Sequence, residues 1–253
     1  MARSTFLILL LCKAAAITLA LLGCWRLAAL VYFGPDGWVL YHLFVPSAQG
    51  LCRSFTRFET ARNEIWLTID DGPDPVDTPQ ILDLLDQHQA RATFFVIGER
   101  AVRYPDLVND IVRRGHQIGH HTQTHPLATF WCASPRRLRA ELDRVIDGLR
   151  PAGIRPHWFR PPVGIKHFLL PAALAARDLQ CVGWSVRSGD VLSREPGSVV
   201  ARVMRQLRPG VIVLVHEGPS MPPAVRVKAI ALLLGKLAGR NFRCVLPDVA
   251  QLR

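Results

Sequence analysis

Five short polar clusters, each placed directly after an apolar run typical of a β-strand, constrain the fold of this chain more than any other feature. The clusters span residues 70–73, 120–126, 160–164, 187–190 and 216–218. In a parallel sheet or barrel the carboxyl ends of all strands meet at one edge, so side chains that follow the strands gather in one place. Asp, His and Arg recur in these clusters. The sequence therefore predicts one polar site at this edge, as in an enzyme.

The apolar runs alternate with helical patterns along the chain. We predict strands at 64–70, 91–97, 116–119, 157–160, 180–186, 211–216 and 242–246. We predict helices at 78–89, 100–114, 134–149, 168–178, 197–207 and 223–239. About seven strands that alternate with helices imply parallel βα units, and thus an α/β fold. A barrel and a doubly wound sheet both fit this alternation.

Length and composition favour one large catalytic domain. The chain has 253 residues, 49% of them hydrophobic, and can bury one substantial core. We divide it into a leader (1–37), a connector (38–62) and a catalytic domain (63–253). The net charge of +11 fits either solubility or attraction to anionic lipid headgroups or phosphate-bearing substrates. No nucleic-acid motif is present, so we expect no nucleic-acid partner. The six cysteines lack metal-ligand spacing, and disulfides are possible without being indicated.

The leader is apolar apart from Lys13 and Arg26. About 20 apolar residues are needed to cross a bilayer, so 14–33 and 5–25 are two possible spans, each with one charge inside it. We predict an uncleaved apolar anchor helix at the membrane. A cleaved or lipidated leader, suggested by a lipoprotein-like box at 21–24, and a soluble helix are the alternatives.

The charges around the leader favour one orientation. If 14–33 is the span, Arg3 and Lys13 precede it, and no Lys or Arg follows before Arg53. Cytoplasmic flanks carry an excess of basic residues, so the catalytic domain is expected outside the cytoplasm. The span 5–25 leaves almost no asymmetry.

Two histidines and two carboxylates suit a metal site. His121 and His125 are four residues apart, so on a helical turn both imidazoles could reach one ion. A carboxylate from the adjacent Asp70 and Asp71 would complete a two-His-one-carboxylate triad. Adjacent carboxylates point in different directions, so one can bind the metal while the other accepts a proton from water. Taken singly, the His pair is more often structural and the Asp pair more often a polar turn.

Arg160 and His216 fit the same site. Arg160 could pair with the second carboxylate and orient it, or form an ordinary surface ion pair. His216 closes a buried strand and is either a core histidine with its hydrogen bonds satisfied or an acid for a leaving group.

Together these motifs resemble the polysaccharide deacetylase family, the NodB-homology carbohydrate esterases, over roughly residues 63–250. The resemblance implies a distorted (β/α) barrel of about seven βα units. From the Thr-Ile-Asp-Asp-Gly-Pro motif it implies that Asp70 is the general base and Asp71 a metal ligand. From the His-Thr-Gln-Thr-His motif it implies that His121 and His125 complete the site of a divalent metal ion, zinc above others.

The later motifs imply the remaining roles. Arg-Pro-Pro-Val-Gly makes Arg160 the residue that orients Asp70, and the Val163 amide a donor to the oxyanion, where the family usually has an aromatic residue. Ile-Val-Leu-Val-His places Leu214 in the acyl pocket and makes His216 the general acid.

The fourth signature departs from the family pattern, which is often Asp-Ser-x-Asp-Trp. Arg187 replaces the first Asp, and Val191 replaces the Trp. We assign Arg187 and Asp190 to the substrate pocket and expect them to pair near its mouth, where they would meet an anionic group of the substrate. A surface ion pair without a role in binding is the alternative.

The resemblance implies metal-assisted hydrolysis of an N-acetyl or other N-acyl group on an amino sugar of an envelope polysaccharide or glycolipid. An O-acyl carbohydrate esterase would use the same residues, and an inactive glycan-binding relative would keep the fold. A structural membrane protein is disfavoured, because the leader is the only apolar span. The expected partners are therefore the glycan or glycolipid substrate and the membrane.

Overall fold

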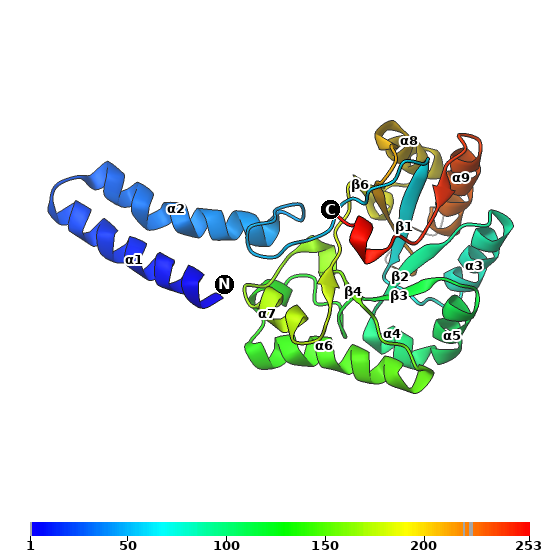
Figure 1. Cartoon of the computed structure of the whole chain (residues 1–253), viewed down its shortest axis with the longest axis horizontal. Helices are drawn as coiled ribbons and strands as arrows, with labels where there is room; N and C mark the ends of the chain where they lie inside the picture. Colours follow the sequence, from blue (N-terminus) through cyan, green and yellow to red (C-terminus); the bar gives the residue numbers. More distant parts are fainter. Residues whose placement is uncertain (1, 220, 223–224) are drawn as a thin grey trace.

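A helical hairpin and an α/β domain make up the chain, and the hairpin projects away from the domain (Figure 1). This computed structural model describes residues 2–219, 221–222 and 225–253. The hairpin joins the domain through residues 45–63, which contain no helix or ladder strand.

Parallel strands form one sheet in the described part of the chain. They are β1 (Glu64–Asp70), β2 (Ala92–Val96), β3 (Gln117–His120), β4 (Trp158–Phe159), β5 (Gln180–Cys181), β6 (Val186–Arg187), β7 (Ile212–His216) and β8 (Arg243–Cys244). The order is β5-β4-β3-β2-β1-β7-β6, with β8 paired to β1. From β1 to β5 the strands follow in chain order without reversing direction, as in a barrel and unlike a doubly wound sheet. The sheet is an open half-barrel, which confirms the predicted α/β class.

Helices follow the strands close to their predicted places. They are α3 (Asp77–Gln87), α4 (Gly98–Arg103), α5 (Pro105–Arg113), α6 (Pro135–Leu149), α7 (Leu170–Ala175), α8 (Pro196–Gln206) and α9 (Arg226–Ala238). The prediction of one helix over 100–114 is wrong, because Pro105 starts a new helix at its first position. The predicted start of the last helix at 223 lies outside the described residues.

The predicted strand over 180–186 is also two strands. β5 pairs with β4 at one end of the sheet, and β6 pairs with β7 at the other. Between them the chain leaves the ladder: the Gly183 N–H donates to the Phe55 carbonyl of the connector (2.8 Å), and the Ser185 N–H donates to Ile212 (3.1 Å). Residues 182–185 thus cross the gap between the two open edges of the half-barrel.

The inward face of β1 leads from the core to the polar edge. Trp66, Thr68 and Asp70 alternate with outward residues that pack against the helices. Trp66 packs with Phe95 and Trp158 in a buried aromatic cluster, and its ring nitrogen donates to Thr93 (2.8 Å). This cluster forms the floor beneath the carboxyl ends of the strands.

The leader differs from the predicted single apolar helix. α1 (Ala2–Leu21) and α2 (Trp25–Phe44) run antiparallel and pack against each other. The chain reverses at Gly23, whose φ of +79° favours glycine. Both predicted spans, 14–33 and 5–25, contain this reversal. α2 also continues through Pro35 and seven residues beyond the predicted boundary at 37.

A charge pair joins the two apolar helices. The Lys13 ammonium forms an ion pair with Asp36 and also donates to the Tyr32 carbonyl. It lies 3.9 Å from the centre of the Tyr32 ring. The lysine that interrupts the apolar run of α1 is therefore neutralised within the hairpin. In the described residues, no helix meets the combined length and hydropathy needed for a membrane span.

Candidate active site

A cleft of about 240 Å³ opens at the carboxyl ends of the strands. It is lined by Asp70, Asp71, Ile97, Arg100, His121, His125, Leu127, Val163, Trp184, Arg187, Val191, Leu214 and His216. Every residue predicted for the site lines this cleft except Arg160 and Asp190, which lie directly behind it. The sheet thus brings together side chains that are up to 146 positions apart in the sequence, from Asp70 to His216.

Three side chains fit one metal ion. Asp71, His121 and His125 offer ligand atoms that all lie within 4.8 Å of one another. Asp71 Oδ1 is 3.5 Å from His121 Nε2 and 3.3 Å from His125 Nε2. In a tetrahedral zinc site with bonds of about 2.0–2.1 Å, neighbouring ligand atoms are about 3.3–3.4 Å apart. The spacing and the donor set therefore suit a small divalent ion.

The protonation states suit the same role. Burial acts to raise the pKa of Asp71, but its hydrogen bond with His121 and the nearby His125 outweigh burial and hold that pKa below its usual value. Burial lowers the pKa of His125 to about 4, so the imidazole is neutral near pH 7. The Nδ1 atom of His121 is 2.8 Å from the Arg160 carbonyl, which leaves Nε2 to face Asp71.

The sequence suggested that the two histidines lie on a helical turn, and the structure shows that they do not. They lie in an irregular loop, with positive φ at Thr122 (63°) and His125 (52°). Buried Glu141 on α6 holds this loop, because its carboxylate accepts hydrogen bonds from the Gln123 and Thr124 amides (2.9 Å each) and the Thr124 hydroxyl (2.6 Å). A long-range contact thus replaces helical geometry in aiming the imidazoles.

Arg160 is fully buried beneath Asp70. Its NH1 donates to Asp70 Oδ1 (2.7 Å) and to Thr68 Oγ1 (2.8 Å), and its other nitrogens donate to the Val182 and Gly183 carbonyls (3.1 and 2.7 Å). The pairing is the one that the sequence suggested, and the surface alternative is wrong. Burial lowers the pKa of Arg160, and Asp70 opposes that effect.

His216 pairs with Asp190. Its Nδ1 lies 2.8 Å from Asp190 Oδ1, and its backbone N–H donates to Asp190 Oδ2 (2.8 Å). Desolvation acts to lower the pKa of His216, but the hydrogen bond and charge of Asp190 outweigh it and raise that pKa. Asp70 and His216 are register partners on β1 and β7, so the two lie side by side.

The expected pair between Arg187 and Asp190 does not form. Gly189, at φ +68°, turns the chain after β6, and Asp190 then faces His216. Among the described residues no ion pair with Arg187 occurs, and its exposed side chain lines the cleft.

Val163 and Leu214 on the cleft wall differ in burial. Leu214 is buried on β7, whereas Val163 is 44% exposed, with a φ of 49° that is strained for a β-branched residue. Sequence reasoning missed four cleft residues. They are Ile97, Arg100, Leu127 and Trp184. Each lies outside the short motifs, and only Trp184, just ahead of the fourth signature, carried a sequence signal.

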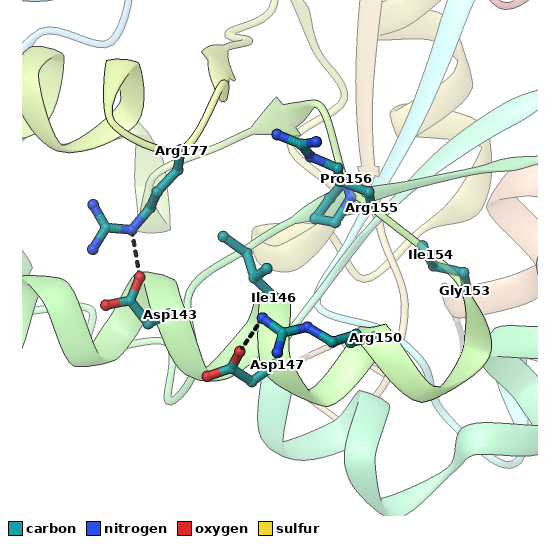
Figure 2. Close-up of a pocket in the computed structure, with 9 residues that line it drawn as sticks. All are labelled: Asp143, Ile146, Asp147, Arg150, Gly153, Ile154, Arg155, Pro156 and Arg177. Atoms are coloured by element: carbon teal, nitrogen blue, oxygen red, sulfur yellow. Dashed lines mark hydrogen bonds and ion pairs between the residues drawn. The ribbon is translucent and has the colours of Figure 1, made fainter.

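A second cleft, of about 650 Å³, lies on the surface beside α6 (Figure 2). Its charged residues are already paired: Arg177 Nε lies 2.6 Å from Asp143, and Arg150 NH2 lies 2.8 Å from Asp147. None of the predicted site residues lines it. We therefore assign the chemistry to the cleft at the strand ends.

Comparisons with known proteins define the family. The model of the family described as polysaccharide deacetylase matches residues 58–181. A chitooligosaccharide deacetylase from Bradyrhizobium sp. (strain ANU 289) is 35% identical over 193 residues, which cover 70% of this chain and 86% of that protein. The chain belongs to the polysaccharide deacetylase family.

Solved structures agree with this assignment. The Bc1960 peptidoglycan N-acetylglucosamine deacetylase matches with a TM-score of 0.69 and 30% identity, over 75% of this chain and 88% of that one. A pseudoenzyme of the same family from Bacillus anthracis, BA3943, matches with a TM-score of 0.66 and 26% identity, over 75% and 65% of the two chains. The same fold therefore occurs in an active deacetylase and in a pseudoenzyme.

The Asp190–His216 pair predicts a change in pH dependence. In Asp190→Asn the carboxylate that raises the pKa of His216 is gone, so that pKa falls. An acid acts only while protonated, so the alkaline limb of kcat/KM should move to lower pH, and kcat/KM near pH 8 should fall about tenfold or more. Profiles of kcat/KM against pH measure both. The exposed Glu195→Gln should leave the limb in place, and an unmoved limb in Asp190→Asn would show that another group sets it.

Proposed function

We propose that this chain is a metal-dependent N-deacetylase that removes an acetyl group from an amino sugar of an envelope glycan. The observation that carries the proposal is the Asp71, His121 and His125 triad beside Asp70 and His216 in one cleft. A ligand set, a base and an acid at one strand edge are the parts that amide hydrolysis needs.

The chain's own residues would move the protons. Asp70, oriented by Arg160, would accept a proton from the attacking water, and His216 would give a proton to the departing amine. The Val163 amide would donate to the developing oxyanion. Leu214 would contact the acyl methyl group. A divalent ion in the triad, with zinc as our first choice, would supply Lewis-acid activation of water and of the acyl carbonyl.

The relatives support an amino-sugar substrate. One is named for chitooligosaccharide, and another for the N-acetylglucosamine of peptidoglycan. The intact ligand, base and acid residues support an active enzyme over an inactive glycan-binding relative. O-deacylation would use the same residues and is the second candidate.

We also propose that Arg187 favours substrates with an anionic group near the scissile amide. The carboxylates around the cleft already have partners: Arg160 holds Asp70, His216 holds Asp190, and the two histidines flank Asp71. Arg100 also lines the cleft, but its guanidinium donates to the Asp71 carbonyl (2.7 Å). The exposed Arg187 side chain would meet a carboxylate or phosphate of the substrate.

We propose further that the hairpin attaches the enzyme to a membrane, with the catalytic domain outside the cytoplasm. Side chains on both helices are exposed and apolar, including Phe6 (65% exposed), Leu30 (67%) and Phe33 (65%). Exposed apolar surface of this extent is costly in water. The pairing of Lys13 with Asp36 lowers the cost of placing the hairpin among lipids.

The first prediction for this function concerns acetate release. The full chain should release acetate from N-acetylated chitooligosaccharides, lose at least 90% of this activity to a chelator, and regain it with zinc. Acetate measured by an enzyme-coupled assay gives the rate, and O-acetylated xylan separates the second candidate. Activity that survives thorough chelation would overturn the metal proposal.

The proposed role of Arg187 is tested with a panel of substrates that do or do not carry a sugar carboxylate. In Arg187→Met the KM should rise selectively for the anionic substrates.

The adjacent aspartates should separate base from ligand. Asp70→Asn should keep its metal and lose about 10²–10⁴-fold in kcat, whereas Asp71→Asn and His121→Ala should lose metal affinity as well. Metal content by mass spectrometry and acetate release are measured together, with Asp248→Asn on the surface as the control. The reverse pattern for the two aspartates would exchange their roles.

Membrane attachment predicts where the chain is found in cells. The full chain should sediment with membranes and resist a high-salt wash. A variant with Phe6, Leu30 and Phe33 each replaced by Glu should move to the soluble fraction while it keeps acetate release. Wild-type chain in the soluble fraction would contradict the attachment.

A further inference from the structure

Two of the six cysteines lie against each other where the connector meets the sheet. Cys52 belongs to the connector and Cys181 ends β5, and both side chains are buried in one hydrophobic cluster. The two thiols interact with each other, and Ser54 Oγ lies 3.6 Å from the Cys181 sulfur. Both cysteines are free thiols in this structure. The deacetylation chemistry uses neither.

The backbone holds these two cysteines in place. The Phe55 N–H donates to the Cys181 carbonyl (2.9 Å), and the Gly183 N–H donates to the Phe55 carbonyl (2.8 Å). The connector therefore runs beside the end of β5, where Phe55 and Val182 form an isolated parallel bridge. Because these hydrogen bonds hold the two segments beside each other, the placement of Cys52 near Cys181 is a property of the fold.

The surroundings favour one of the two sulfur atoms as a thiolate. The hydrogen bond from Cys52 lowers the pKa of Cys181, burial opposes that effect, and the nearby Lys166 ammonium and Arg160 guanidinium add to the lowering. The same contact and burial raise the pKa of Cys52. A thiolate beside a thiol is the arrangement that thiol–disulfide exchange requires.

We propose that Cys52 and Cys181 form a disulfide site that fastens the connector to β5. The oxidant is an external disulfide, either a small molecule or a thiol–disulfide oxidoreductase. The Cys181 thiolate attacks one sulfur atom of that disulfide, and the other sulfur leaves as a thiolate. Cys52 then gives up its proton and attacks the Cys181 sulfur, which releases the second external thiol. One external S–S bond is reduced by two electrons to two thiols, and one internal S–S bond forms from two protein thiols.

The bond would act on the catalytic centre through two neighbours. Val182 and Gly183 follow Cys181 directly, and their carbonyls accept hydrogen bonds from Arg160. Arg160 in turn holds Asp70. A disulfide that closes the long loop between residues 52 and 181 also restricts the unfolded chain, and long loops gain the most in that model. The oxidised enzyme is therefore more stable, with the position of Arg160 more tightly fixed.

Oxidation of the full-length protein tests this site. The chain is purified with a reductant, equilibrated with a range of ratios of oxidised to reduced glutathione, and blocked by alkylation in denaturant. Peptide mapping should then show one crosslink, between Cys52 and Cys181, with a mass 2 Da below that of the two thiol peptides. The Tm should rise by about 5–10 °C on oxidation and return with dithiothreitol.

Matched variants separate this site from the other thiols. Cys52→Ser and Cys52→Ala should abolish both the crosslink and the Tm response, whereas Cys132→Ser at the surface and Cys244→Ser in another part of the core should keep both. The peptide map of the wild-type chain stands even if a variant fails to fold. Alkylation of both Cys52 and Cys181 at every glutathione ratio, or a crosslink between other cysteines, would overturn the proposal.

Discussion

The buried contact between Arg160 and Asp70 determines how the rest of the site is arranged. A fully buried guanidinium is costly unless its donors are satisfied, and here four acceptors surround it. Removing one partner of a buried ion pair costs about 3–5 kcal/mol, because the remaining charge stays buried. Asp70 is therefore held in one orientation, beside the candidate metal ligands and register-paired with His216. The Phe95 ring packs against the guanidinium, with its centre 4.2 Å from Arg160 Cζ.

This contact depends on an irregular part of the sheet. In a regular strand, the carbonyls of Val182 and Gly183 would accept from a neighbouring strand. Because β5 ends at Cys181 and β6 begins at Val186, both carbonyls are available to Arg160. The sheet gives up ladder hydrogen bonds in this gap, and the guanidinium takes their place. The buried position of Arg160 thus depends on the gap in the half-barrel.

The sequence predicted the parts of the molecule that depend on local pattern. Strand ends and the helix start at Pro135 follow from periodicity and residue type, and the structure places them where they were expected. The three candidate metal ligands, identified by residue type, lie together. The predictions that failed concern segments whose structure is determined by contacts with residues far away in the sequence. A single strand over 180–186 was the natural prediction, because nothing in its apolar residues signals that its two halves join opposite edges.

In the candidate site, too, local pattern predicted the residues, and distant contacts determine their geometry. Residue types identified His121 and His125, but their geometry comes from Glu141, far along the chain, and not from a helical turn. Spacing placed Arg187 near Asp190 and could not reveal that Gly189 turns the carboxylate toward His216. The hairpin was missed because two apolar helices and one long apolar helix have the same composition. The turn at Gly23 and the Lys13–Asp36 contact distinguish them.

Opposite partners give Asp70 and His216 different surroundings although they are neighbours. On adjacent strands, each is held from behind by a buried group of opposite charge, Arg160 for the carboxylate and Asp190 for the imidazole. A carboxylate and an imidazole left side by side would otherwise pair with each other and share a proton. The two partners draw them into separate hydrogen-bonded pairs, so one can accept a proton and the other can donate one in the same cleft. Replacement of the family's first Asp by Arg187 leaves both pairs intact, and so it alters the rim of the cleft without altering the two groups that we propose transfer protons.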